Sequence, residues 1–152
     1  MTALLLALTW LGGALEPKTP AGGNPRPMNL DDFFKLERIS DARISPDGRH
    51  VAYVVTVPSL TDNKSTSSIW IAEVSTGKTA QLTRSPKRDR RPRWSPDART
   101  IAFAQRHFFA GTAEADWGDD VVLQPADGSA SRIVRTHAQR GETIEGIAWI
   151  PD

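Results

Sequence analysis

The spacing of hydrophobic and polar residues changes once along the chain, close to residue 38. In residues 29–39, NLDDFFKLERI, the apolar side chains cluster for burial, Asn29 is a good N-cap, and two aspartates follow near the positive end of the helix dipole. This pattern predicts one short helix at 30–37. Beyond it the helical period disappears. Short runs rich in Val, Ile, Tyr, Phe and Trp alternate with Pro, Gly, Asp and Ser, which predicts β-structure for the rest.

Residues 44–55, ISPDGRHVAYVV, are typical of a hairpin corner followed by a strand. Pro46 presets the φ of the second turn position, Asp47 can hydrogen-bond back onto the backbone, and Gly48 can take a positive φ. In the strand that follows, at 50–55, the alternating side chains are apolar on both faces, so both faces should be covered. Such a strand lies between two packed sheets.

The same motif occurs again about fifty residues later. Residues 94–105, WSPDARTIAFAQ, match it with Ala98 in the place of Gly48, and residues 146–152, GIAWIPD, match its beginning. If the second corner also needs a positive φ, Ala98 costs on the order of 1 kcal/mol relative to glycine.

A second motif alternates with the first. Residues 69–83 match residues 121–135, aligning Gly77 with Gly128 at a spacing of 51, and each copy is typical of a further hairpin. Strand motifs that alternate with a period of 50–55 residues favour a β-propeller. The predicted fold class is therefore all-β: a partial β-propeller over 29–152, with about two four-stranded blades at 39–91 and 92–145, the start of a third at 146–152, and the short helix in front.

The first 28 residues differ in kind from the rest. Residues 3–15 form an uncharged apolar run, too short to span a hydrocarbon core of roughly 30 Å but of the right length for a signal peptide. Gly12 and Ala14 offer a cleavage site, although no Lys or Arg precedes the run. We expect a signal peptide at 1–15, a Pro/Gly-rich linker at 16–28, and a secreted or periplasmic protein without a stable membrane span. The alternative is a buried start of the chain.

Composition excludes several classes of function. A formal net charge of +1 is too small to indicate a general nucleic-acid or membrane-surface partner, and 39% hydrophobic with 24% charged residues is typical of a soluble globular protein. Because the chain has no cysteine, disulfide scaffolds, thiolate metal sites and cysteine nucleophiles are excluded. No phosphate-binding glycine loop, metal-ligand histidine pair or dinucleotide fingerprint occurs, so we expect no cofactor.

At this point the residues match a known family. The chain resembles the N-terminal propeller of the prolyl oligopeptidase family of serine peptidases, especially its acylaminoacyl-peptidase-like and dipeptidyl-peptidase-like members. The resemblance is close over 29–105 and looser over 119–152. The motif SPDG alone is less specific, because TolB-type propellers carry it too. The segments that carry the resemblance are NLDDFFKLERISD (29–41), SDARISPDGRHVAYVV (40–55), SSIWIAEVSTGKTAQLT (67–83) and RPRWSPDARTIAFAQ (91–105).

The resemblance implies a C-terminal α/β-hydrolase domain with a Ser-Asp-His triad and a G-x-S-x-G nucleophile motif. This chain carries neither. Its nearest string, GSASR at 128–132, lacks the second glycine and falls in a predicted hairpin turn, and no histidine has a nucleophile at a recognisable spacing. We therefore expect the chain to be inactive alone, although the parent family is a family of hydrolases. The histidines His50, His107 and His137 are more typical of surface polar residues.

Residues 84–93, RSPKRDRRPR, hold six Arg or Lys in ten positions. A nucleic-acid site would need interleaved aromatics, so a solvated loop between blades is the preferred interpretation. A sharper alternative concerns Arg91 and Arg93, which alternate with Pro92 and Trp94 where the strand that lines a propeller's channel would begin. In an intact enzyme they could present charge to a peptide carboxylate, which makes them candidate substrate-channel residues.

Residues 108–120 are predicted to form an acidic insertion. The loop lacks the D-x-D-x-D-G order of a calcium site, so we expect no metal there. A role in substrate gating is the alternative that the family suggests. The acidic residues concerned are Glu114, Asp116, Asp119 and Asp120. The tryptophans predicted to form core between blades are Trp70, Trp94 and Trp149.

Two functions remain open. In the first, the chain is a non-catalytic propeller fragment of an exported serine peptidase, truncated before a C-terminal α/β-hydrolase partner domain, and the propeller gates the access of peptide substrates. The chain ends within a copy of the first motif, and two blades cannot close a ring, so self-association is expected. In the second, the chain is a TolB-like periplasmic propeller module that binds proteins.

Overall fold

The computed structural model describes residues 26–61, 63–108, 117–135 and 143–150. The predicted signal peptide at 1–15 lies outside the described residues, as do most of the linker, His137, and the acidic residues Glu114 and Asp116. No described helix is long and apolar enough to cross a membrane.

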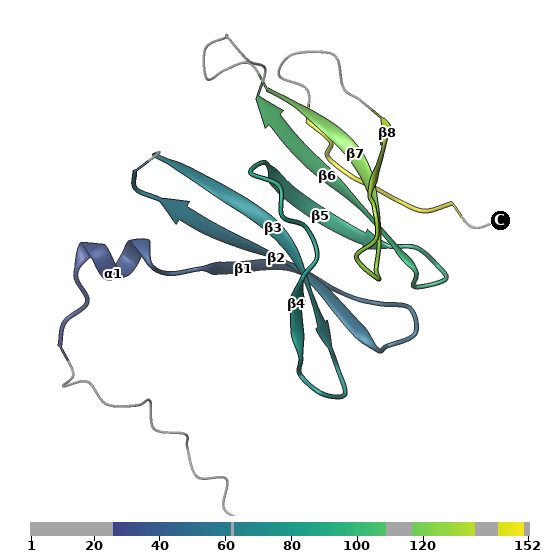
Figure 1. The fold of residues 1–152 in the computed structure, drawn as a ribbon, viewed down its shortest axis with the longest axis horizontal. Coiled ribbons are helices and arrows are strands. Elements are labelled where there is room, and N and C mark those ends of the chain that lie inside the picture. The colour runs from purple at the N-terminus through teal and green to yellow at the C-terminus, as the bar shows by residue number, and fades with distance from the viewer. Residues whose placement is uncertain (1–25, 62, 109–116, 136–142, 151–152) are drawn as a thin grey trace, which may run out of the picture.

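The first blade is a four-stranded antiparallel sheet. Its strands follow one another along the chain and pair in that order, so every connection is a hairpin (Figure 1). The central pair is the longest and runs without a register shift from one end to the other. The strands are β1 (Arg38–Ile44), β2 (His50–Ser59), β3 (Lys64–Glu73) and β4 (Thr79–Gln81).

The second blade repeats this arrangement with β5 (Arg88–Trp94), β6 (Thr100–Phe108), β7 (Trp117–Pro125) and β8 (Arg132–Arg135). In the strand pairing, a single parallel residue pair, Ser67 with Arg88, connects the sheets of the two blades, and the combined sheet stays open with β1 and β8 at its ends. The fold is a partial β-propeller, which confirms the predicted fold class. The predicted insertion at 108–120 is strand from Trp117 onward.

The N-terminal helix α1 (Leu30–Phe34) is shorter than the predicted range 30–37. It begins with a capping box, in which Asn29 and Asp32 accept each other's backbone N–H. It ends early because the backbone N–H groups of Lys35 and Leu36 bond to carbonyls only three residues back, which tightens and closes the last turn. None of its residues is buried.

The core lies between the two blades. It is built from the side chains of β2 and β3 that turn toward the second blade and from those of β5, β6 and β7 that turn back to meet them. On β2 the opposite face is covered only in part among the described residues: Val55 is buried there, whereas Val51 and Tyr53 are half-buried. The cluster consists of Ala52, Ile69, Trp94, Ile101, Phe103 and Val122.

The two hairpin corners are built alike. In each, a serine hydroxyl donates to the aspartate two residues later at 2.5 Å and accepts the backbone N–H five residues later at 2.9 Å. Gly48 has φ +71° and Ala98 has φ +59°. The second corner thus has the positive φ on which the predicted cost of Ala98 depends, and Ala98 occupies a conformation that favours glycine.

Candidate functional site

The innermost strand of each blade is interrupted by a bulge. The pairing of β1 with β2 shifts between Ser40 and Arg43, and the pairing of β5 with β6 shifts at the equivalent place, between Arg90 and Arg93. One residue in each bulge has a positive φ: Asp41 at +47° and Arg91 at +59°. A repeated bulge that needs strained non-glycine residues places charged side chains at the same point of successive blades.

These bulges carry a network of opposite charges. The Asp41 carboxylate lies 2.9 Å from the Arg43 guanidinium of its own strand and 3.4 Å from that of Arg93 in the next blade. Arg91 donates to the backbone carbonyl of Glu145 and lies 3.2 Å from its carboxylate. The two arginines that the sequence singled out therefore belong to different junctions between repeats and each already has an acidic partner.

About 30% of each of the Arg91 and Arg93 side chains is exposed. Arg93 also donates to the carbonyl of Pro92 at 2.8 Å, which fixes its direction. An incoming carboxylate would meet guanidinium groups that are already paired with Asp41 or Glu145. That these arginines contact a substrate stays a prediction.

Tryptophan indoles tie each repeat to the one before it. Trp94 donates its indole N–H to the backbone carbonyl of Arg43 at 2.9 Å, and Trp149 donates to that of Arg93 at 3.1 Å. Trp94 is buried in the core between the blades, as expected. Trp70 differs, because its indole donates to the Ser68 hydroxyl within its own strand.

Asp119 on β7 is a buried carboxylate with several polar partners. Its side chain is fully buried, pairs with Arg90 and Arg106, and accepts the hydroxyl of Thr143 at 3.0 Å and the backbone N–H of Ile144 at 2.9 Å. Burial raises its pKa, but these hydrogen bonds and charges outweigh burial and hold the pKa below the usual carboxyl range. The sequence pattern predicted that Asp119 lies in an acidic loop. In the structure Asp119 lies on β7 and binds residues 143 and 144, which follow the second blade.

On the face of the second blade opposite the Asp119 side chain, buried polar residues form a second row. Asp89 is fully buried and accepts the Gln105 amide at 2.9 Å, and the pKa of Asp89 is raised, chiefly by burial. Asp120 is buried on the adjacent strand, where its carboxylate lies 3.2 Å from His107. Within the part of the chain that the structure describes, no three His, Asp or Glu residues come together as a metal site.

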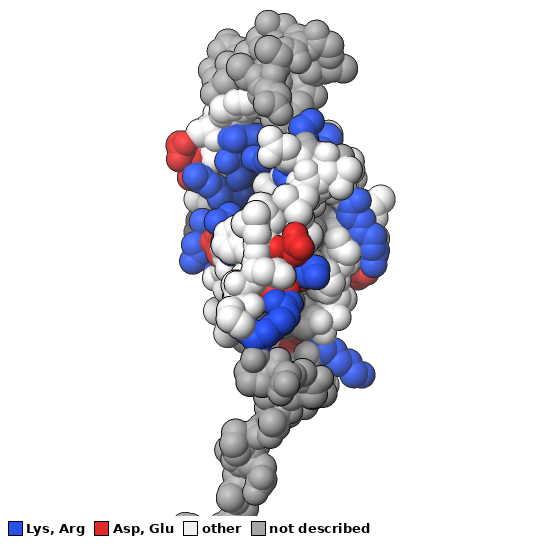
Figure 2. All heavy atoms as spheres, turned by 90° about the vertical axis from the view of Figure 1, so that its left-hand side faces the viewer, with Lys and Arg blue, Asp and Glu red and all other residues white. Residues whose placement is uncertain are grey.

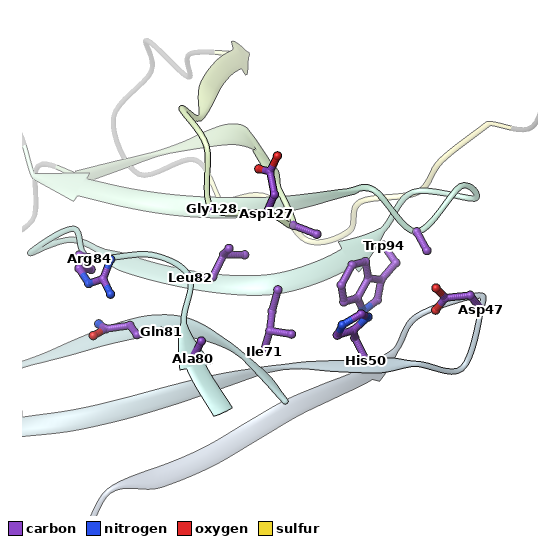
Figure 3. A pocket seen from close by; sticks show the side chains of 12 residues that line it. Asp47, His50, Ile71, Ala80, Gln81, Leu82, Arg84, Trp94, Asp127 and Gly128 are labelled. Carbon is purple, nitrogen blue, oxygen red and sulfur yellow. The ribbon is translucent and has the colours of Figure 1, made fainter. Parts of the chain in front are cut away.

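A groove of about 610 Å³ opens between the two blades. Figure 3 shows its floor and its charged ends: Arg84 lies at one end, Asp47 at the other, and Ile71 and Leu82 between them. The ring of His50 lies 6.3 Å from that of Trp94 in the same groove. The groove shares no lining residue with the inner-strand charges around Asp41.

Lysine and arginine side chains are spread over the surface in separate groups. On the face seen in Figure 2, these groups are divided by uncharged surface and interrupted by acidic residues. That face does not present one continuous basic stripe of the kind that tracks a nucleic-acid backbone.

The fold defines a β-propeller segment of two blades, and the comparisons find it similar to parts of proteins that are named as peptidases. No protein-family model matches the chain. The chain is 41% identical over 125 residues to the uncharacterized peptidase YuxL of Bacillus subtilis (strain 168), a match that covers 82% of this chain and 18% of that protein. It is 29% identical over 101 residues to dipeptidyl-peptidase 5 of Porphyromonas gingivalis, covering 65% of this chain and 14% of the other.

A solved structure agrees. The chain superposes on an acylaminoacyl peptidase in complex with Z-Gly-Gly-Phe-chloromethyl ketone with a TM-score of 0.52 and 26% identity, over 67% of this chain and 14% of the other. The chain thus spans less than a fifth of the length of these relatives. They are its homologues, and the resemblance to the propeller portion of the prolyl oligopeptidase family is confirmed over the residues that the matches cover.

Proposed function

We propose that this chain supplies the first blades of the propeller of an exported serine peptidase and has no catalytic activity of its own. The observation that carries the proposal is the 41% identity over 125 residues to a protein named a peptidase, in a chain whose described residues fold as two propeller blades. The sequence lacks a G-x-S-x-G motif, so the nucleophile of such an enzyme would belong to a hydrolase domain outside these 152 residues.

In that enzyme the propeller limits which peptides reach the hydrolase site. The inner-strand bulges support this role, because they lie in the strands that would border a propeller's channel. The charged residues at these bulges are Asp41, Arg43, Arg91 and Arg93. A peptide carboxylate that enters the channel would exchange with Asp41 or Glu145 on these partly exposed guanidinium groups. Export is proposed from the apolar run at 3–15 alone.

The test uses the complete protein read from the gene that encodes this chain, beside the 152-residue chain itself. We expect the complete protein to hydrolyse aminoacyl and peptidyl chromogenic substrates and to react with a fluorophosphonate probe, while the chain alone does neither. A fluorophosphonate label on the chain, or a complete protein without G-x-S-x-G, would overturn the proposal.

The channel role is tested by Arg93→Gln in the complete protein. We expect KM for peptides with a free carboxylate to rise about fivefold, with kcat unchanged and amidated peptides unaffected, because the guanidinium contributes binding and no chemistry. Arg99→Gln, at an exposed corner, is the matched control. Equal changes for free and amidated peptides would contradict the channel role.

A protein-binding propeller module of the TolB type is the second candidate, favoured by the two SPDG-type corners that the structure shows. The downstream reading frame separates the candidates. A stop codon after a short propeller favours the binding module, whereas further blades and a G-x-S-x-G motif favour the peptidase.

A further inference from the structure

The groove between the blades has features that the packing of blades does not require. A smaller cavity, of about 220 Å³, lies at the equivalent place after the second blade, where Thr100, Leu123 and Trp149 take the positions of His50, Ile71 and Trp94. The repeat itself therefore produces a recess at each junction.

Small residues form much of the wall of the first recess. Ala80 pairs with Ile71 in the first blade, and Arg132 pairs with Leu123 in the second, so Ala80 and Arg132 are equivalent. The long side chain of Arg132 lines the smaller cavity, whereas the alanine methyl leaves the larger one open. The other small residues that line the larger groove are Ala98, Ala126 and Gly128.

The two ends of the groove carry opposite charges. Arg84 is exposed and has no ion-pair partner among the described residues. At the other end, Asp47 accepts the Ser45 hydroxyl at 2.5 Å. Asp127 lines the groove nearer its middle, where its carboxylate accepts the Ser129 backbone N–H at 2.8 Å and points away from the floor (Figure 3). The hydrogen bonds from Ser45 and Ser129, respectively, lower the pKa of each aspartate below its usual range, so both stay ionised at neutral pH.

The floor between these ends is apolar, with Ile71, Leu82 and Trp94 as its largest side chains. The indole N–H of Trp94 already donates to Arg43, so the ring offers the groove only an apolar surface. A recess of this size with a largely apolar floor and a few polar side chains, which include His50 and Gln81 as well as the charged ends, has the usual composition of a small-ligand site.

We propose that this groove binds short zwitterionic peptides: the peptide carboxylate on Arg84, its ammonium group on Asp47, and an apolar side chain on the floor (Figure 3). A peptide with free termini matches this order of cation, apolar surface and carboxylate, whereas an apolar molecule or a simple anion matches only part of it. The site is separate from the inner-strand arginines and does not depend on the catalytic function proposed above.

The experiment is isothermal titration of the full 152-residue chain with Ala-Leu-Ala, its N-acetyl form and its C-terminal amide. We expect saturable binding of the free tripeptide and about fivefold weaker binding of each blocked form, since each block removes one charge pair. Equal affinities for the three peptides, or no saturable binding to the folded chain, would overturn the proposal.

Two variants place the peptide in the groove. Ala80→Arg copies the residue that the chain itself carries at the equivalent position, and we expect it to fill the groove and abolish binding. Arg84→Gln should bind the free tripeptide and its amide equally, whereas Arg99→Gln, an exposed corner arginine that does not line the groove, should behave as the unmodified chain. Far-UV circular dichroism checks that each variant folds. If Ala80→Arg does not fold, the exposed Arg84→Gln still decides, and an unchanged preference for the free carboxylate there would refute the placement.

Discussion

The two hairpin corners have the same local structure but differ in the residue that takes a positive φ, and these two residues differ in the free-energy cost of that φ. Gly48 and Ala98 both have a positive φ, within corners whose hydrogen bonds are the same. An L-residue in the left-handed region costs roughly 1–2 kcal/mol. Glycine recovers that cost but loses about 0.4–1 kcal/mol through the greater freedom of the unfolded chain.

Ala98→Gly should therefore raise the free energy of unfolding by about 0.5–1 kcal/mol, which corresponds to a rise in melting temperature of about 2–4 °C. Gly48→Ala should lower it by a similar amount. A Cβ at position 48 would meet no other atom within 4 Å, so that change measures backbone strain without a steric clash.

The assay is urea denaturation of the full chain and both variants, followed by far-UV circular dichroism, with Arg99→Gln as an exposed control in the second corner. Opposite signs for Ala98→Gly and Gly48→Ala are expected. If both substitutions lower the free energy of unfolding, the methyl group of Ala98 contributes more through packing in the groove than its backbone costs, and the strain argument fails.

Three further substitutions test the buried polar groups. Asp119→Asn should lower the free energy of unfolding by about 2–3 kcal/mol, because it leaves two arginines beside a neutral amide, and the effect should fade as the pH falls through the lowered pKa of Asp119. Asp89→Asn should act in the opposite direction and stabilise the chain at pH 7 but not at acid pH, since a raised pKa means that ionised Asp89 opposes folding as the pH rises. Trp94→Phe should cost about 1–2 kcal/mol through the lost bond to Arg43. Thermal unfolding between pH 3 and pH 8 measures all three. Parallel pH profiles for the two aspartate variants would contradict the assignment.

The repeat and its corners could be predicted because their signals are local. Turn residues at fixed offsets identify the corners, and the substitution of Ala98 for Gly48 was enough to predict a strained position that the structure contains. The fold class followed from the period of the two motifs. The helix was predicted three residues too long, because the early closure of its last turn at Lys35 leaves no composition signal.

The polar interior could not be predicted in the same way. Asp119 and Asp120 follow an acidic stretch, so composition indicates a loop, yet both are buried on β7 against arginines and a histidine from neighbouring strands. The partners of Arg91 and Arg93 lie 54 and 52 residues away, and only the bulges turn those side chains toward them. The groove was also missed, because small residues of both blades, among them Ala80 and Ala98, come together to line it only in the folded chain.

The hydrogen bond from Trp94 or Trp149 to the preceding repeat has a backbone acceptor, which no amino-acid substitution can remove. Trp94 and Trp149 bond to the main-chain carbonyls of residues 43 and 93, not to their side chains. The side chains at positions 43 and 93 can therefore change while these hydrogen bonds to the next repeat remain. Substitutions there can alter the charge and polarity of the inner strand without separating the repeats.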